Sequence, residues 1–532
     1  MRSEAKNCLT DESVCPTPLP KALQAGGAGA FACQPIFSRM VLFRCFVWLS
    51  MAAVASAATE RSPLADLADR ARALPPEFAA DALLRIAAAP TRTDVAWRRG
   101  VIEEAFRLAA GAQQPFARRN WTGTSTGIFD KAFAQGLDAC TLECRAVHAM
   151  LALDPKKARE LFAEIPAPQI PPLSCEDALV YNVSVFYDTL GEVAQRTFSA
   201  KEVADEEPVH LLVRYVADLT SPVQAAPIAR MLAGASLKPA QLEALADSFA
   251  GALKQLSGDD RAFSSTISGE GGGAAVEALA AACTRRQISP LPLLDAWRGY
   301  LVRHLSGARC ADSGSQTSPN ISSGMVTGGA SPPVLSGLPE AVRFFNENMR
   351  TGELRAISAD EVQPSKAEGK ASAAGQCDSP QCRQLAAQYA SLLLGPEGLA
   401  LSAEQKGGAE WAVKLRAFLA ALADWKGDDP AECFQWKSRF YIDLFALAPN
   451  GSDRDLLLST LLTWLQQNNY QRDHGVEWFY PVNVLIIRTF ADPLGMKTTM
   501  RELRNSADPV ISFYAQLEQM LPRPIERTVG LL

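Results

Sequence analysis

The stretch SPLADLADRARALPP, residues 62–76, holds the signals of one complete helix. Ser62 and Pro63 supply a capping residue and a first-turn proline, and apolar residues then recur every three or four positions as far as Leu74. The two prolines that follow end the helix, because proline lacks the N–H that a continuing helix needs. The same spacing recurs over residues 78–86, 97–108, 158–165, 242–253 and 457–465. The sequence therefore predicts an all-α fold.

Three helix exits share a form in which a proline follows an apolar helix end and another helix starts within a few residues. They are residues 86–90, 151–155 and 445–449. This arrangement is typical of antiparallel helix pairs. The second exit, Leu-Ala-Leu-Asp-Pro, resembles the helix junction of tetratricopeptide repeats, and the likeness concerns this junction alone. We expect antiparallel helix pairs packed as an α-α superhelix, a helical-repeat-like array, in two lobes.

The length and two low-complexity stretches suggest where the lobes divide. At 532 residues the chain exceeds the size at which a single core usually stops growing. Two stretches rich in small and polar residues cannot bury enough apolar surface to offset the entropy of ordering them. We therefore expect an N-terminal lobe over residues 58–308, a flexible linker over 309–336, and a C-terminal lobe over 337–532 with a disordered insertion at 351–376. The alternative is that both stretches are loops of one continuous superhelix.

Residues 40–57 read MVLFRCFVWLSMAAVASA, with an arginine ahead of an apolar run and Ala-Ser-Ala at the end. The apolar run is shorter than the roughly 20 residues that span a bilayer. This pattern predicts a cleaved secretory signal, so we expect translation to begin at Met40 and residues 1–57 to form a leader and signal peptide. We expect an exported protein, periplasmic or extracellular, with no transmembrane span after the signal peptide.

Two segments rich in β-branched and aromatic residues, 180–187 and 482–487, are the best strand candidates. The first keeps Val183, Phe186 and Leu190 at helical spacing, which favours a helix. A lone strand at the second position would have no sheet to join.

Composition and motifs exclude several classes of function. A net charge of -6 offers no broad positive field for a phosphate backbone, so nucleic acid is not expected as a partner. Residues 123–127 match the G-x-S-x-G string of hydrolases, but polar and basic residues precede the serine where a buried strand is needed. Residues 269–274 resemble a dinucleotide-binding glycine pattern, but helices precede them. We find no assembled catalytic group and expect no cofactor.

Cys140, Cys144 and His148 are spaced four residues apart on one predicted helix, and Cys175 follows after a short helix and loop. A disulfide from Cys140 or Cys144 to Cys175 is one interpretation, because disulfides persist outside the cytosol. Buried thiols and a soft-metal site closed by Cys175 are the alternatives. The three helix residues span about 12 Å along the axis and do not easily meet on one ion. We therefore assign no metal.

Cys377 and Cys382 are separated by Asp-Ser-Pro-Gln just ahead of another predicted helix. A metal site there would need two further ligands, and none is nearby in the sequence. A disulfide that closes a small loop is expected instead.

Titratable and aromatic residues gather near the C-terminus, where Asp473, His474, Glu477 and Trp478 lie in a predicted loop. A histidine beside carboxylates can act as a general base, and exposed aromatic rings can form a binding platform. The competing interpretation is that the aromatic rings anchor the loop to the core while the charged groups stay solvated. This segment is the first candidate for a pocket.

Taken together, these patterns predict a non-catalytic, exported helical protein that binds or scaffolds another protein or polymer of the cell envelope. The support is architectural, since stacked helix pairs make extended binding surfaces. The alternative is an envelope hydrolase whose acid and base residues come together only on folding.

Overall fold

A computed structural model describes residues 63–523 except for 90–93, 114–116, 120–131, 175–176, 180–181, 257–260, 264–271, 312–338, 364–365, 371–378, 396–398, 428, 449–450, 468–473 and 492–495. Ser62–Leu532 form one compact unit. The predicted signal peptide, the G-x-S-x-G string, Cys175, Cys377 and Asp473 lie outside the described residues. The division into two lobes stays a prediction.

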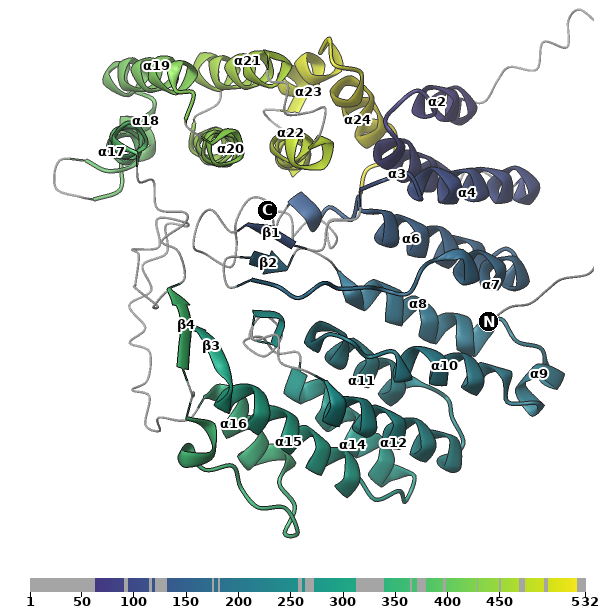
Figure 1. Cartoon of the computed structure of the whole chain (residues 1–532). Coiled ribbons are helices and arrows are strands. Elements are labelled where there is room, and N and C mark those ends of the chain that lie inside the picture. Colours follow the sequence, from purple (N-terminus) through teal and green to yellow (C-terminus); the bar gives the residue numbers. More distant parts are fainter. Residues whose placement is uncertain are drawn as a thin grey trace, which may run out of the picture. The chain divides into compact units, whose positions relative to one another are not determined.

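The fold is all-α, as the sequence predicts (Figure 1). The first part of the chain forms α2 (Pro63–Ala71), α3 (Pro76–Ala87), α4 (Val95–Ala109), α6 (Ala139–Leu151), α7 (Pro155–Glu164), α8 (Val183–Arg196), α9 (Ala200–Ala204), α10 (Glu207–Ala217), α11 (Ala225–Gly234), α12 (Pro239–Gln255), α14 (Gly272–Arg285), α15 (Leu291–Ser306) and α16 (Glu340–Phe344). The second part forms α17 (Pro380–Leu393), α18 (Ala403–Lys406), α19 (Ala409–Asp424), α20 (Pro430–Leu447), α21 (Ser452–Gln467), α22 (Gly475–Ala491), α23 (Met496–Arg504) and α24 (Pro509–Met520). Within the described ranges three single turns are also present, at η1 (Pro222–Gln224), η2 (Phe345–Met349) and η3 (Ala359–Val362).

Among the described residues, extended structure is limited to two short two-stranded ladders and one isolated antiparallel bridge between Leu394 and Ala400. β1 (Ala117–Arg119) pairs antiparallel with β2 (Asp177–Leu179), and β3 (Ala308–Ala311) pairs in parallel with β4 (Lys366–Lys370). β3 lies at the start of the predicted linker, and η3 and β4 lie in the insertion that was expected to be disordered. The flexible linker and the disordered insertion stay predictions.

The predicted helix exits join packed pairs, since α3 packs on α4, α6 on α7, and α20 on α21. At the second exit, Asp154 accepts a hydrogen bond from the Lys157 backbone N–H at 3.0 Å, and Pro155 occupies the first helical position. Arg99 of α4 forms an ion pair with Asp154. The Leu-Asp-Pro sequence therefore both starts α7 and ties it to the preceding pair.

The strand candidate over residues 482–487 is wrong, because these residues lie inside α22. A continuous apolar run fits a strand or a helix that is buried on every side, and α22 is of the second kind. The helical interpretation of the first candidate is confirmed from Val183 onward by α8.

Helix pairs repeat along the chain at a regular interval. The first helices of four successive pairs are α6, α8, α11 and α14, which begin at residues 139, 183, 225 and 272. This spacing is about 45 residues, as in solenoid repeats built from two helices. In one layer α6 packs on α8, α8 on α11, and α11 on α14, while in the other layer α10 packs on α12 and α12 on α15. In the second part of the chain, Figure 1 shows α19, α21 and α23 in one row above α17, α20 and α22.

The first helices that the structure describes pack against the last ones. α2 contacts α24, and the Phe78 ring of α3 lies 5.1 Å from the Phe479 ring of α22 and 5.8 Å from the Tyr514 ring of α24. One continuous core includes side chains from α2 through to α24. No helix in the described part of the chain is both long enough and apolar enough to cross a bilayer.

Candidate functional site

The candidate pocket at the C-terminus is the start of a helix rather than a loop. His474 directly precedes α22, and Glu477 and Trp478 lie in its first turn. Trp478 is fully buried and donates its indole N–H to the Leu465 carbonyl of α21 at 3.1 Å. Its ring therefore packs in the core, in agreement with the interpretation that the aromatic rings anchor this segment, and it forms no exposed platform.

A carboxylate of α3 joins this helix start. The Oε1 atom of Glu77 lies so close to residue 475 that a Cβ atom there would approach it to 2.9 Å. Burial raises the pKa of Glu77, and the nearby charge of Glu477 raises it further. His474 Nδ1 lies 3.6 Å from Glu477 Oε1, and the His474 side chain is 34% exposed whereas that of Glu477 is 1% exposed. Glu77, His474 and Glu477 form an acid–base cluster, of which His474 reaches solvent.

One turn further along α3, Asp81 forms the centre of a buried polar group. Its carboxylate accepts a hydrogen bond from the Tyr514 hydroxyl at 2.8 Å and lies 2.8 Å from Arg145 Nη2 of α6. Burial favours the protonated acid, but the guanidinium groups of Arg145, Arg85 and Arg523 outweigh it and lower the pKa of Asp81. Burial, followed by the charge of Asp81, raises the pKa of Tyr514. The pair therefore consists of an ionised carboxylate and a neutral phenol.

Glu518 of α24 is the second buried carboxylate of this network. Arg85 Nη2 lies 2.7 Å from Glu518 Oε2 and donates to the Leu521 carbonyl, and Arg523 Nε lies 2.9 Å from the same carboxylate. Arg523 also donates to Asn483 Oδ1, whose amide in turn donates to Gln135 Oε1 at 2.6 Å. These bonds connect α3 and α24 with α22 and the turn that precedes α6.

The residues of this network, which we call the closure network, are Asp81, Arg85, Gln135, Arg145, Asn483, Tyr514, Glu518 and Arg523. It places three guanidinium groups around two carboxylates, so attraction and hydrogen bonding offset part of the cost of burying them. Its members come from both ends of the chain. Its principal action is to fasten the first helices to the last.

The residue patterns alone did not predict Glu77 or the closure network as candidate sites. One local signal exists, because Asp81 lies within the apolar run Phe78-Ala-Ala-Asp-Ala-Leu-Leu, where a charged side chain must find a buried partner. Of its partners, Tyr514 is more than 400 residues away in the chain and Arg145 lies in another helix. The spacing of residues carries no information about such a pairing.

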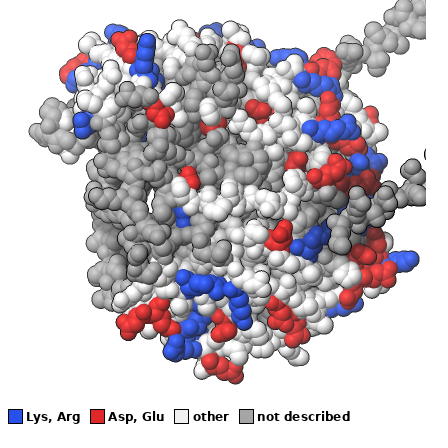
Figure 2. Space-filling view, viewed as in Figure 1, with Lys and Arg blue, Asp and Glu red and all other residues white. Residues whose placement is uncertain are grey.

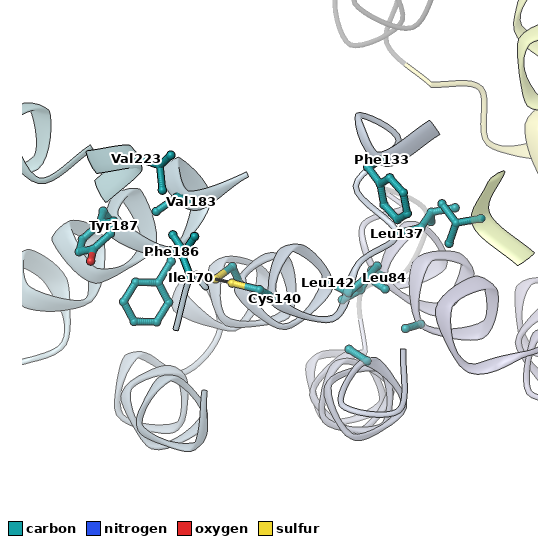
Figure 3. Close-up of a cluster of buried hydrophobic side chains, with 14 of the residues drawn as sticks. Leu84, Phe133, Leu137, Cys140, Leu142, Ile170, Val183, Phe186, Tyr187 and Val223 are labelled. Atoms are coloured by element: carbon teal, nitrogen blue, oxygen red, sulfur yellow. Dashed lines mark hydrogen bonds between the residues drawn. The ribbon is translucent and has the colours of Figure 1, made fainter. Parts of the chain in front are cut away.

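The predicted cysteine site is partly assembled. Cys140 and Cys144 lie in α6 with their sulfur atoms 3.9 Å apart, and both are thiols. Figure 3 shows Cys140 among apolar side chains that include Ile170 and Phe186. The predicted disulfide from either residue to Cys175 is not supported, because the two sulfur atoms lie in the apolar contact of α6 with α8 and remain thiols.

His148 does not join these sulfur atoms. Its side chain is 63% exposed and its Nδ1 lies 3.2 Å from Glu192 of α8. Within the described residues no cluster of three or more His, Cys, Asp or Glu side chains is placed to hold a metal ion.

Cys382 takes part in a disulfide bond at the start of α17. The sulfur atom that it bonds lies outside the described side chains. Its pairing with Cys377 therefore stays a prediction.

No protein-family model matches the chain, and no curated protein matches it in sequence.

Proposed function

We propose that this chain is an exported, non-catalytic helical-repeat-like protein that binds another protein or polymer of the cell envelope. The observation that carries the proposal is the stacking of helix pairs at intervals of about 45 residues. Each pair packs on the next pair along the chain. Such arrays present the same element of every repeat to one side and so form extended binding surfaces. The charged side chains of the closure network support the proposal of a non-catalytic role, since they bond to one another and hold helices together.

The surface charge is compatible with a protein or uncharged polymer as the partner. Figure 2 shows acidic and basic side chains interspersed on the face that it presents. A polyanion such as nucleic acid is attracted by a field of one sign, and an interspersed surface supplies none.

A photo-crosslinking experiment tests the proposal. Crosslinkers are placed at exposed positions of one layer, Asp188 of α8 and Arg230 of α11, and of the other layer, Arg214 of α10 and Asp247 of α12. The mature chain is then incubated with its native envelope. A bound macromolecule should crosslink to both positions of one layer and to neither of the other. Absence of crosslinks from all four positions, or equal capture from both layers, would contradict binding along the array.

An envelope hydrolase is the second candidate, and the acid–base cluster is the observation that favours it. A carboxyl group whose pKa is raised by burial can donate a proton, and a solvent-reaching histidine can accept one. In this proposal Glu77 is the acid and His474 the base. Incubation with isolated envelope should then release soluble fragments, Glu77→Gln should abolish the release, and the exposed control Glu243→Gln should leave it unchanged. Release that is unaffected by Glu77→Gln would exclude this site.

A further inference from the structure

Cys140 and Cys144 present two sulfur atoms on one face of α6. The sulfur atoms are 3.9 Å apart, and the two residues are 4% and 1% exposed. Residues four apart in a helix share a face, so the helix itself sets this spacing. Neither the closure network nor the acid–base cluster includes them.

The helix prevents the two thiols from joining in a disulfide. In a regular helix the Cβ atoms of residues four apart are about 5–6 Å from each other, whereas a disulfide needs a separation of about 3.5–4.5 Å. The first turn of α6 is held in place, because Asp138 accepts a hydrogen bond from the Thr141 backbone N–H at 2.9 Å. Oxidation of the pair would require this turn to unwind.

A metal ion held between the two sulfur atoms meets no such obstacle. With metal–sulfur bonds of about 2.3 Å, two sulfur atoms on one ion lie roughly 3.8 Å apart at a tetrahedral angle and about 4.6 Å apart when collinear. The observed 3.9 Å lies within this range. The helix thus places the donors within about 0.7 Å of the separation that a collinear two-ligand ion requires.

The surroundings select the kind of metal. Thiolates favour soft ions, and an ion that accepts two ligands is satisfied by this pair, whereas structural zinc takes four. No set of three or more ligating side chains is placed for a metal among the described residues. We propose that Cys140 and Cys144 form a binding site for a soft monovalent metal ion, namely Cu(I).

Binding is a proton exchange without electron transfer. Each thiol loses its proton, two S–H bonds are replaced by two metal–sulfur bonds, and the bis-thiolate complex of a monovalent ion carries one negative charge. The apolar side chains around Cys140, with Phe186 and Ile170 among them, keep water from the bound ion (Figure 3).

Anaerobic titration of the reduced full chain with Cu(I), in competition with a chromogenic Cu(I) chelator, tests the proposal. We expect binding at the pair to give thiolate-to-copper absorption in the near ultraviolet and to release two protons per ion. Cys140→Ser and Cys144→Ser should each weaken binding by about 100-fold or more, because each removes one of two ligands. The matched control is Cys283→Ser, which changes another buried thiol, in α14, and should leave the affinity unchanged.

Affinity that is unchanged in both Cys140→Ser and Cys144→Ser, or lost equally in Cys283→Ser, would overturn the proposal. So would zinc binding at the pair as tight as Cu(I) binding. If a variant fails to fold, X-ray absorption of the copper-loaded wild-type protein decides independently. Two sulfur neighbours support the site, and a shell of nitrogen or oxygen neighbours contradicts it.

Discussion

Glu143 shows how burial raises the pKa of a carboxyl group. The residue is 6% exposed on α6, and burial raises its pKa to about 7, with further contributions from the charges of Asp138 and Glu164. Its ordinary value is 4.5. Between pH 4.5 and 7 the folded chain therefore keeps a proton that the unfolded chain has lost. Stability is lost as the pH rises through this window.

Glu143→Gln should remove this dependence of the unfolding free energy on pH, because an amide is uncharged at every pH and so no charge is buried on folding. We expect the variant to be more stable than the wild type at pH 8, by at most about 3 kcal/mol, and little changed at pH 4. Urea denaturation at both pH values measures the difference, with the exposed Glu243→Gln as the control. A difference that is the same at pH 4 and pH 8 would show that the Glu143 carboxyl does not titrate as described.

Arg85 is the residue of the closure network whose loss should cost most. Its side chain is 11% exposed, it bonds Glu518, and its Nη1 atom has no hydrogen-bond partner within the described part of the chain. Arg85→Met should lower the free energy of unfolding by about 3–5 kcal/mol, because a buried ion pair loses a partner.

The matched control for Arg85→Met is Arg72→Met. Arg72 pairs with Glu104 at the surface, with side chains 37% and 33% exposed. An exposed pair contributes about 1 kcal/mol or less. Equal losses of unfolding free energy for the two variants would refute the assignment of the Arg85 pair as buried.

At the scale of the element, α7 depends on a single residue at its start. Asp154 caps the helix and also pairs with Arg99 of the preceding helix pair. Asp154→Ala should lower the free energy of unfolding by about 1 kcal/mol through the lost cap alone. Asp154→Asn keeps a capping oxygen and loses only the ion pair, so it should cost less. Thermal unfolding of both variants measures the two effects, and an alanine variant no less stable than the asparagine variant would contradict the cap.

The start of α22 illustrates how an element depends on its neighbour. Gly475 stands where a side chain would meet the Glu77 carboxylate of α3. The sequence predicts a loop over residues 473–478, whereas α22 begins at Gly475. The approach of α3 brings Glu77 close enough to Glu477 for the two charges to interact.

At the scale of the whole molecule, the two ends of the chain should unfold together. Phe78 is 1% exposed and contacts both Phe479 and Tyr514. Phe78→Ala should therefore accelerate hydrogen exchange in α2–α4 and also in α22–α24, while α12 and α15 stay protected. The matched control is Phe249→Ala in α12, which should have the converse effect. Faster exchange confined to residues 63–109 would show that the ends are not coupled.

The sequence by itself determined the helical class, the three helix exits and the cap of α7. These features depend on residues within a few positions of one another, and side-chain spacing, proline and capping groups act over that range. It also determined that Cys140 and Cys144 share a helix face, because four-residue spacing imposes it. The interval of about 45 residues was not recognised, since it becomes visible only once the helix boundaries are known.

Only the tertiary structure decided which side chains meet across the chain. Asp81 and Tyr514, Arg85 and Glu518, and Glu77 and Glu477 are brought together by the docking of α3 against α22 and α24. It likewise decided that Trp478 is a core residue, because α21 covers it. The physical reason is that these contacts arise from the packing of apolar faces, which is non-directional and leaves no mark in the local spacing of the polar residues that it brings together.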